Sequence, residues 1–272
     1  MALTPHAGCA LRGRHAGGAD VRPVDVAVII PAWNSARYLD ATLESAITAI
    51  GRLDASAQIL VVDDGSTDAT AAITRRYARY GVELFRQPNL GTEMARNAGL
   101  ALTNSRFVAH LDHDDVWPPD RWSPLLAALE RAPDIEAVFG RAVEFADPDA
   151  PRAARWNPDA ALVRIPTVGV VRRSAHVRYG GFRPGHDQMA WSARALARGL
   201  RYETVEDVVL RRRIHAANQS HRRPFLADRS RVAVVKNALE ERRHAARTAV
   251  ADVGRPLASV HPGVPHDPAA LR

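Results

Sequence analysis

Short apolar runs alternate with longer amphipathic stretches through the first half of this chain, and this alternation narrows the folds available to it. Runs rich in β-branched residues are typical of buried strands, and here they cover 24–30, 59–62, 82–85 and 106–111. Apolar residues spaced three or four apart predict helices, which here cover 35–50, 69–80 and 92–102. Such alternation produces right-handed crossovers. The sequence therefore predicts an α/β fold whose mostly parallel sheet is flanked by helices.

The pattern beyond residue 115 is less regular. It predicts a helix over 118–130, a strand over 138–145, a helix over 187–199 and a strand or extended segment over 202–210. Residues 147–166 are rich in Pro, Arg, Ala and Asp, which is typical of a long loop. Residues 211–213 are all arginine. If they lie in a strand, at most two of their side chains share one face.

The chain is expected to contain one folded domain with additional segments at both ends. We expect a flexible leader over 1–23, the domain over 24–222, a basic helix over 223–248 and a flexible tail over 249–272. The basic helix is expected to face solvent or a partner, and peripheral contact with an anionic membrane is the alternative.

Charge and cysteine content restrict the classes of partner. The 272 residues carry a formal charge of +7, which favours nucleic acid, anionic lipid or phosphate-bearing substrates. No nucleic-acid-binding motif is present, and few aromatic residues are interleaved with the arginines, so we expect no nucleic acid partner. The single Cys9 excludes an intrachain disulfide, and no apolar run approaches the ~20 residues of a membrane span. A cytoplasmic protein, at most peripheral to a membrane, is expected.

Polar loops follow three of the predicted strands. They are Pro31–Asn34, Asp63–Ser66 and Asp112–Asp115. In parallel sheets, ligands bind beside the carboxyl ends of the strands. We therefore expect these three loops to face one crevice.

The third of these loops carries Asp112, Asp114 and Asp115, and we call residues 112–115 the acidic loop. Carboxylates this close repel one another unless a cation lies among them. Mg²⁺ and Mn²⁺ prefer such hard oxygen ligands and commonly share them with substrate phosphates. The alternative is a solvated acidic loop, and the polar loops upstream favour the cation. His113 is expected to face away from it.

Four motifs occur in order between residues 26 and 122. They read Val28-Ile-Ile-Pro-Ala-Trp-Asn34, Val61-Val-Asp-Asp-Gly-Ser-Thr-Asp68, Ala95-Arg-Asn-Ala-Gly-Leu100 and Leu111-Asp-His-Asp-Asp115. Each alone is weak, but the set and its spacing resemble family 2 glycosyltransferases of the GT-A (Rossmann-like) fold. The similarity continues more loosely to about residue 220. It implies a nucleotide-sugar-binding half over 24–122 and an acceptor half over 123–222.

The resemblance implies roles for the acidic loop and for one arginine. Asp114 and Asp115 match the residues that hold a divalent cation, Mn²⁺ or Mg²⁺, and Asp112 supports them. Arg96 matches a basic position near the donor diphosphate; the alternative is a solvated charge on a helix surface.

The resemblance also places the nucleotide. Asp64 matches the carboxylate that accepts a hydrogen bond from the base, usually uracil, and Asp63 lies beside it. Pro31, Ala32 and Trp33 match the backbone turn that holds the nucleotide. Trp33 takes the place of an aromatic residue that can pack against the base. A UDP-sugar donor is therefore expected.

The catalytic base is expected in the acceptor half. Family members often show Glu-Asp at the start of a helix that contains an arginine. With Arg194 and Gly199 setting the register, Asp187 takes the Glu place and Gln188 the Asp place. Glutamine cannot accept a proton, so Gln188 cannot be the base. If the match to the family motif is shifted by one residue, Asp187 takes the place of the base. We assign Asp187 as the base, with a purely structural helix cap as the alternative.

His215 lies in a segment similar to one that returns toward the active site in the family. It could ligate the cation or contact the diphosphate, and the alternative is a structural or surface histidine. The implied reaction is the inverting transfer of one sugar to a hydroxyl acceptor, which could be a glycan, a lipid-linked glycan, a natural product or a peptide.

Two other functional classes are alternatives to a sugar transferase, namely a silent binding protein and another kind of nucleotide enzyme. A catalytically silent relative that binds nucleotide sugar or glycan is compatible with Gln188. A phosphatase of the doubly wound class would need Asp-x-Asp-x-Thr after its first strand, and a nucleotidyltransferase usually has a Gly-rich phosphate loop. Neither motif is present at the first predicted strand, which is followed by Pro31–Asn34.

Overall fold

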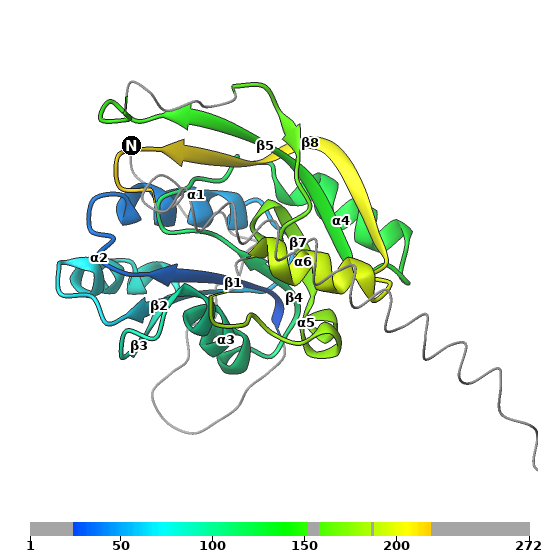
Figure 1. Cartoon of the computed structure of the whole chain (residues 1–272), viewed down its shortest axis with the longest axis horizontal. Coiled ribbons are helices and arrows are strands. Elements are labelled where there is room, and N and C mark those ends of the chain that lie inside the picture. The colour runs from blue at the N-terminus through cyan, green and yellow to red at the C-terminus, as the bar shows by residue number, and fades with distance from the viewer. Residues whose placement is uncertain (1–23, 152–157, 186–187, 219–272) are drawn as a thin grey trace, which may run out of the picture.

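The computed structural model describes residues 24–151, 158–185 and 188–218, which fold around one eight-stranded sheet (Figure 1). Its strands are β1 Val24–Ala32, β2 Ala57–Asp64, β3 Val82–Gln87, β4 Ser105–His110, β5 Ala137–Ala146, β6 Ala161–Leu162, β7 Gly169–Arg172 and β8 Tyr202–Ile214. The order is β3-β2-β1-β4-β7-β5-β6, and β8 pairs with β5. Strands β1 to β4 pair in parallel, as do β5 and β8, while β7 is antiparallel to both neighbours. The predicted mostly parallel sheet is confirmed.

Helices cover both faces of the sheet. They are α1 Leu39–Ile50, α2 Thr70–Arg76, α3 Thr92–Leu102, α4 Trp122–Arg131, α5 Arg173–Tyr179 and α6 Gln188–Ala197, with single 3₁₀ turns at Ala78–Tyr80 and Pro166–Val168. Buried side chains of α1, α2 and α4 share one core, whereas α3, α5 and α6 pack on the opposite face. The domain is therefore a three-layer α/β/α sandwich.

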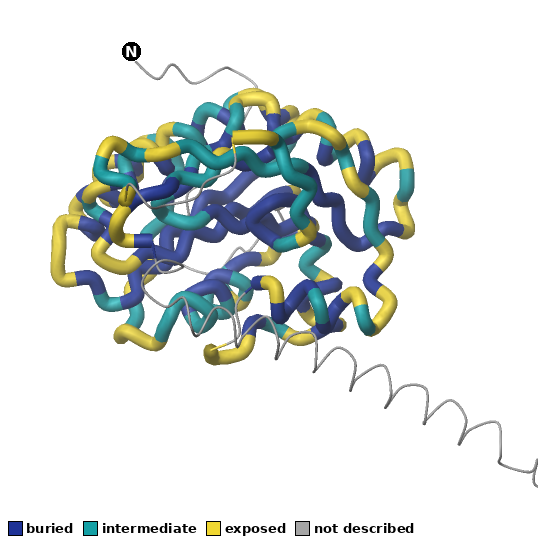
Figure 2. The backbone as a smooth tube through the Cα atoms, turned by 45° about the horizontal axis from the view of Figure 1, so that its top comes forward, coloured by how far each residue is buried: buried dark blue, intermediate teal, exposed yellow. Residues whose placement is uncertain are grey.

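The central strand β1 is buried on both faces, which is why it reads as a continuous apolar run (Figure 2). Val28 and Ile30 enter the core under α1, and Ile29 enters the core under α3. Helix α3 approaches β1 closely at Gly99, where an added Cβ would lie 2.4 Å from Ile29 Cγ2. Glycine at this position therefore sets the distance between α3 and the sheet.

Several element boundaries differ from the sequence prediction. Asp63 and Asp64 end strand β2 instead of forming a turn. The helix predicted to begin at residue 69 begins at Thr70, because Asp68 Oδ1 accepts the Thr70 N–H at 2.9 Å, and it ends at Arg76. The prediction missed β7 and α5 altogether, since a four-residue strand carries no periodic signal.

Some predictions fall on residues that the structure does not describe. These are the leader over 1–23, the basic helix and the tail, together with Asp187 and part of the predicted long loop. Within the described ranges, no helix combines the length and apolar character needed to cross a bilayer.

A buried pair of histidines joins the end of β4, at His110, to helix α5, at His176. His110 and His176 are 0% and 3% exposed, with ring centroids 5.4 Å apart. Among the described residues, none of their four ring nitrogens has a hydrogen-bond partner. Burial lowers the pKa of His176 to about 3, and burial followed by the neighbouring His176 and Arg96 charges lowers that of His110 well below its usual value. Both rings are therefore neutral in the folded protein.

The domain should lose stability in mild acid because of these rings. Below the unfolded-state pKa of about 6.5 only the unfolded chain takes up the proton, which costs ~1.4 kcal/mol per pH unit for His176 until the pH approaches its folded pKa. Between pH 8 and pH 5 this ring should cost the wild type about 2 kcal/mol of stability, and His176→Phe should not show that loss. Urea unfolding at both pH values measures this difference. An equal acid loss in wild type and variant would contradict the assignment.

Candidate active site

Three polar strand ends meet at one edge of the sheet. Strands β2, β1 and β4 are parallel neighbours, and Ala32 at the end of β1 pairs with Asp63 at the end of β2. On the other side, Leu111 N–H donates to Ile29 O at 3.1 Å as the chain enters the acidic loop. The crevice predicted from the sequence therefore has its three loops side by side.

Asp64 accepts three hydrogen bonds from residues in the described ranges. Its Oδ1 accepts from Gln87 Nε2 at 2.7 Å and from Leu90 N–H at 2.9 Å, and its Oδ2 accepts from Gly91 N–H at 2.8 Å. A carboxylate has about four acceptor positions. Oδ2 therefore keeps one acceptor position, which a donor group of a ligand could use.

Asp63 is fully buried and shapes the adjoining turn. Its Oδ1 accepts from Ser66 N–H at 2.8 Å, and its Oδ2 accepts from Arg86 Nε at 2.7 Å. Ser66 Oγ in turn accepts from the N–H of Asn34, which has a left-handed φ of 48°. Asp63 therefore supports the turn and leaves the neighbouring Trp33 side chain 47% exposed.

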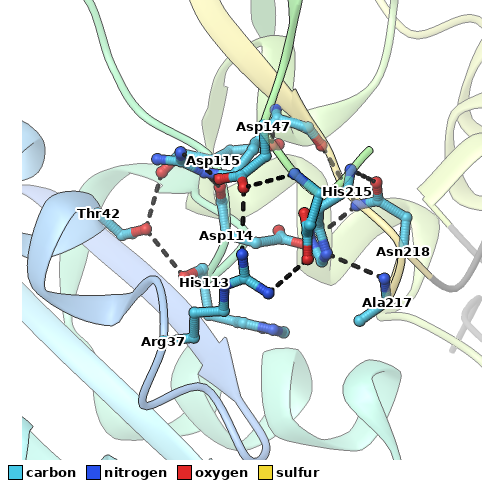
Figure 3. Close-up of polar contacts among 11 residues, drawn as sticks. Arg37, Thr42, His113, Asp114, Asp115, Asp147, His215, Ala217 and Asn218 are labelled. Carbon is cyan, nitrogen blue, oxygen red and sulfur yellow. Dashed lines mark hydrogen bonds and ion pairs between the residues drawn. The ribbon is translucent and has the colours of Figure 1, made fainter. Parts of the chain in front are cut away.

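Helix α1 holds the acidic loop from below. Thr42 Oγ1 lies 2.9 Å from His113 O and 2.8 Å from Asp115 O, so its single proton is shared between two carbonyls (Figure 3). Ser45 Oγ accepts from Trp117 N–H at 3.1 Å. Two hydroxyl groups one helical turn apart thus fix the backbone of the loop.

Strand β8 holds the same loop from the other side. Val116 and Arg211 exchange two backbone hydrogen bonds, of 3.1 and 2.9 Å. Arg213 N–H donates to Asp115 Oδ1 at 2.8 Å, and Arg213 Nε donates to Asp114 O at 3.0 Å. The arginine side chains alternate as expected, since Arg212 pairs instead with Glu144.

Asp114 faces His215, which is 3% exposed (Figure 3). Ala217 N–H donates to Nδ1 of this histidine, so Nε2 is the nitrogen that donates, and it lies 3.0 Å from Asp114 Oδ2. Asn218 Nδ2 donates to the same oxygen at 3.3 Å. Both hydrogen bonds to the Asp114 carboxylate recorded within the described residues fall on Oδ2, and Oδ1 has none.

Arg96 is buried, so it is not the solvated helix charge considered as an alternative. Its guanidinium donates to Asp112 Oδ1 at 2.6 Å. Gln188 Nε2 lies 3.5 Å from Asp112 Oδ2, and Gln188 Oε1 accepts from Thr167 N–H at 2.9 Å. Asp112 thus connects α3 on one side with the start of α6 on the other.

The pKa values of the neighbouring carboxyl groups of Asp114 and Asp115 are shifted in opposite directions. Burial, followed by the charges of Asp114 and Asp112, raises the pKa of Asp115 well above its ordinary value. Burial also opposes ionisation of Asp114, but the hydrogen bond from His215 and the nearby His113 outweigh it and lower the pKa of Asp114. Asp114 therefore carries negative charge more readily than Asp115 does.

A second charged network borders the acidic loop. Asp147 pairs with Arg213 and Arg37, each at 3.2 Å. The Tyr38 ring packs against the His215 ring, with centroids 4.4 Å apart and planes tilted by 42°. These contacts of Arg37, Tyr38 and Asp147 leave no signal in the sequence, because the partners are far apart along the chain.

The acidic loop suits a cation that shares its ligands with a substrate. Within the described residues, no group of three or more His, Cys, Asp or Glu side chains is arranged so that it could hold a metal ion without further ligands. Asp112 and Asp114 are 32% and 17% exposed at their side chains, and Asp114 Oδ1 has no protein partner there. Mg²⁺ and Mn²⁺ commonly take one or two carboxylates and complete their shell with phosphate and water. The donor set fits such an ion.

Comparison with known proteins identifies the family. The family model for glycosyl transferase family 2 matches residues 27–192. The chain belongs to this family. Two relatives from Rhizobium meliloti are the succinoglycan biosynthesis proteins ExoO, 32% identical over 59% of this chain and 47% of that protein, and ExoU, 30% identical over 67% and 60%. The family 2 chain described here thus spans about half of the first relative and three fifths of the second.

Solved structures confirm the GT-A fold. The mannosyltransferase PcManGT from Pyrobaculum calidifontis, in complex with GDP-Man and Mn²⁺, aligns with a TM-score of 0.57 at 21% identity over 89% of this chain and 80% of that chain. S. aureus TarS 1–349 in complex with UDP-GlcNAc aligns with a TM-score of 0.57 at 17% identity over 72% and 60%. At these identities the likeness concerns the fold alone.

The acidic loop should lose its shape when Thr42 loses its hydroxyl. Thr42→Val leaves two buried carbonyls without their donor, so we expect a stability loss of about 1–3 kcal/mol. Urea unfolding measures it. Thr48→Val is the matched control, because Thr48 lies on the same helix and its partly exposed Oγ1 donates only to Glu44 O; its cost should stay within about 0.5 kcal/mol. Equal costs for the two variants would contradict the supporting role of Thr42.

Proposed function

We propose that this chain transfers a sugar from a nucleotide-diphosphate donor, a UDP-sugar, to a hydroxyl acceptor with inversion of the anomeric carbon. The observation that carries the proposal is that Asp64, at the end of β2, and the acidic loop, after β4, lie at the same edge of the sheet in a chain of glycosyl transferase family 2. Only the end of β1 separates them.

The donor nucleotide would lie over the ends of β1 and β2. The remaining acceptor position of Asp64 Oδ2 is suited to an N–H of the base. Trp33 offers an exposed aromatic ring beside Pro31 and Ala32. Arg96 is fixed on Asp112 and directs positive charge toward the acidic loop, where the diphosphate would lie.

Asp114 and Asp115 would hold a Mn²⁺ or Mg²⁺ ion, supported by Asp112. Asp114 supplies the more accessible oxygen, since Asp115 is 4% exposed and accepts from Arg213 N–H. A divalent cation neutralises the negative charge that develops on a departing diphosphate. His215 is hydrogen-bonded to Asp114 and holds it in place, which supports assigning His215 to the donor site.

Asp187 would act as the base. Its carboxylate takes the proton of the acceptor hydroxyl as that oxygen bonds to the anomeric carbon, while the bond from this carbon to the diphosphate oxygen breaks. One displacement inverts the anomeric centre. The neighbouring Gln188 cannot take the proton, and its amide is oriented by Thr167 N–H and Asp112.

Removing the charge of Asp114 should abolish cation-dependent donor binding. In wild type, UDP with Mn²⁺ at a hundredfold excess over Kd stabilises the fold by about 2.7 kcal/mol. We expect Asp114→Asn to lose this thermal shift while keeping the melting temperature of the free protein within a few degrees. Asp54→Asn, at an exposed position, is the control. An unchanged Mn²⁺-dependent shift in Asp114→Asn would remove this residue from the cation site.

Removing the base should separate turnover from binding. We expect Asp187→Asn to reduce transfer by about 10²–10⁴-fold, the range of a general base, with UDP affinity unchanged. Turnover is measured by UDP release in the presence of acceptor. Wild-type turnover in this variant would exclude Asp187, and a higher turnover in Gln188→Asp would move the base to position 188.

A silent binding protein is the second candidate, and the Gln188 amide favours it because it stands where family members often carry a carboxylate. This candidate predicts nucleotide-sugar binding without UDP release under any acceptor, and no gain from Gln188→Asp. The transferase proposal predicts UDP release that requires both Mn²⁺ and Asp187.

A further inference from the structure

Asn97 is the residue of the Ala95–Leu100 motif whose purpose the donor site does not explain. Its side chain lies on α3, next to Arg96, but makes contacts in the opposite half of the domain. Asn97 Nδ2 donates to Phe182 O at 2.7 Å, and Phe182 N–H donates to Asn97 Oδ1 at 2.8 Å. The amide thus pairs with both backbone polar groups of Phe182, as a residue of a neighbouring strand would.

The same loop is held from its other side by α6. Arg194 Nε donates to Tyr179 O at 3.0 Å, and Arg194 Nη2 donates to Gly181 O at 2.6 Å. Trp191 Nε1 donates to Gly180 O at 2.8 Å. Successive carbonyls are therefore bound by side chains of α6, while α3 binds the next residue. We call residues 179–182 the clamped segment.

Gly181 permits the contact with α3. A Cβ added to Gly181 would lie 2.4 Å from Asn97 Oδ1, and its three nearest neighbours are all atoms of Asn97. The φ of Gly181 lies outside the left-handed range. A side chain at position 181 would collide with Asn97, whereas the backbone conformation at this position does not itself require glycine. Gly181 and Asn97 therefore form a matched pair.

The clamped segment leads into the part of the chain that faces the acidic loop. Asp187 and Gln188 follow Phe182 by five and six residues. At the start of α6, the Gln188 amide lies between Thr167 N–H and Asp112. Because Arg96 also binds Asp112, helix α3 contacts the acidic loop through one residue and the clamped segment through the next.

We infer that Asn97 is a positioning residue, which together with Gly181 sets the start of α6 against the acidic loop and so controls the transfer step without contributing to donor binding. This inference rests on the proposed function. The donor side depends on Arg96, Asp64 and the acidic loop, none of which Asn97 contacts with its side chain. Loss of Asn97 should therefore displace the acceptor side alone.

The test is a double-mutant cycle of Asn97→Ala and Gly181→Ala. Each single change separates the clamped segment from α3, by removing the amide or by pushing it away. We expect each to lower kcat on the order of ten- to a hundredfold, as misplacement of a reacting group does, with the UDP–Mn²⁺ Kd within about twofold of wild type. Asn104→Ala, the same change at an exposed position just after α3, is the control.

The double variant decides between coupling and independence. The three atoms nearest to the Cβ that Gly181→Ala adds all belong to the amide that Asn97→Ala removes. The double variant should therefore be no worse than Asn97→Ala, and the two effects should not add. Additive losses would overturn the pairing. A fall in UDP–Mn²⁺ affinity equal to the fall in kcat would overturn the restriction to the acceptor side, and wild-type kcat in Asn97→Ala would overturn the inference as a whole.

Amide hydrogen exchange separates this inference from the proposed function. We expect Asn97→Ala to increase exchange in the peptides covering 180–195 and to leave those covering 57–64 unchanged. If wild type binds UDP–Mn²⁺ but transfers no sugar, the transferase proposal fails, and the exchange data still decide whether Asn97 holds the start of α6. Unchanged exchange at 180–195 would refute the positioning role.

Discussion

The crowding of Asp112, Asp114 and Asp115 at the end of β4 is the constraint on which the site depends. Charges this close cannot all be buried without compensation, and the fold compensates each one differently. Asp112 receives the Arg96 guanidinium, Asp114 receives His215, and Asp115 receives a backbone N–H of β8. The backbone between them is fixed by Thr42. The loop is thus held by contacts with α1, α3 and β8, and among the described residues one carboxylate oxygen of Asp114 has no partner.

Helix α3 links the two sides of the domain. Its N-terminal half lies beside the loop that contributes Leu90 and Gly91 to Asp64, and its middle contributes Arg96 to the acidic loop and Asn97 to the clamped segment. Gly99 then brings the helix close to β1. One short motif therefore joins α3 to the sheet through Gly99, to the acidic loop through Arg96 and to the clamped segment through Asn97.

The sequence predicted the parallel half of the sheet and the convergence of its polar loops, because β1, β2 and β4 are buried on both faces and leave apolar runs bounded by turns. The resemblance to family 2 placed Arg96 near the donor diphosphate, whereas its contact with Asp112 came from the structure. The sequence could not reveal Thr42, which reads as part of the buried face of α1, or the contacts of Asn97 and Asp115, whose partners are 85 and 98 residues away. Strand β7 escaped prediction because four residues are too few to show a period. Long-range polar pairs leave no local signal, so these contacts needed the structure.

The most direct measurement is the position of Mn²⁺ in crystals of the protein grown with UDP and MnCl₂, located by anomalous scattering. The account predicts one strong peak within coordination distance of Asp114 Oδ1 and of the UDP diphosphate, with the base over Asp64 and Trp33. A well-ordered UDP whose diphosphate lies away from the acidic loop, with no manganese peak at Asp114, would contradict it.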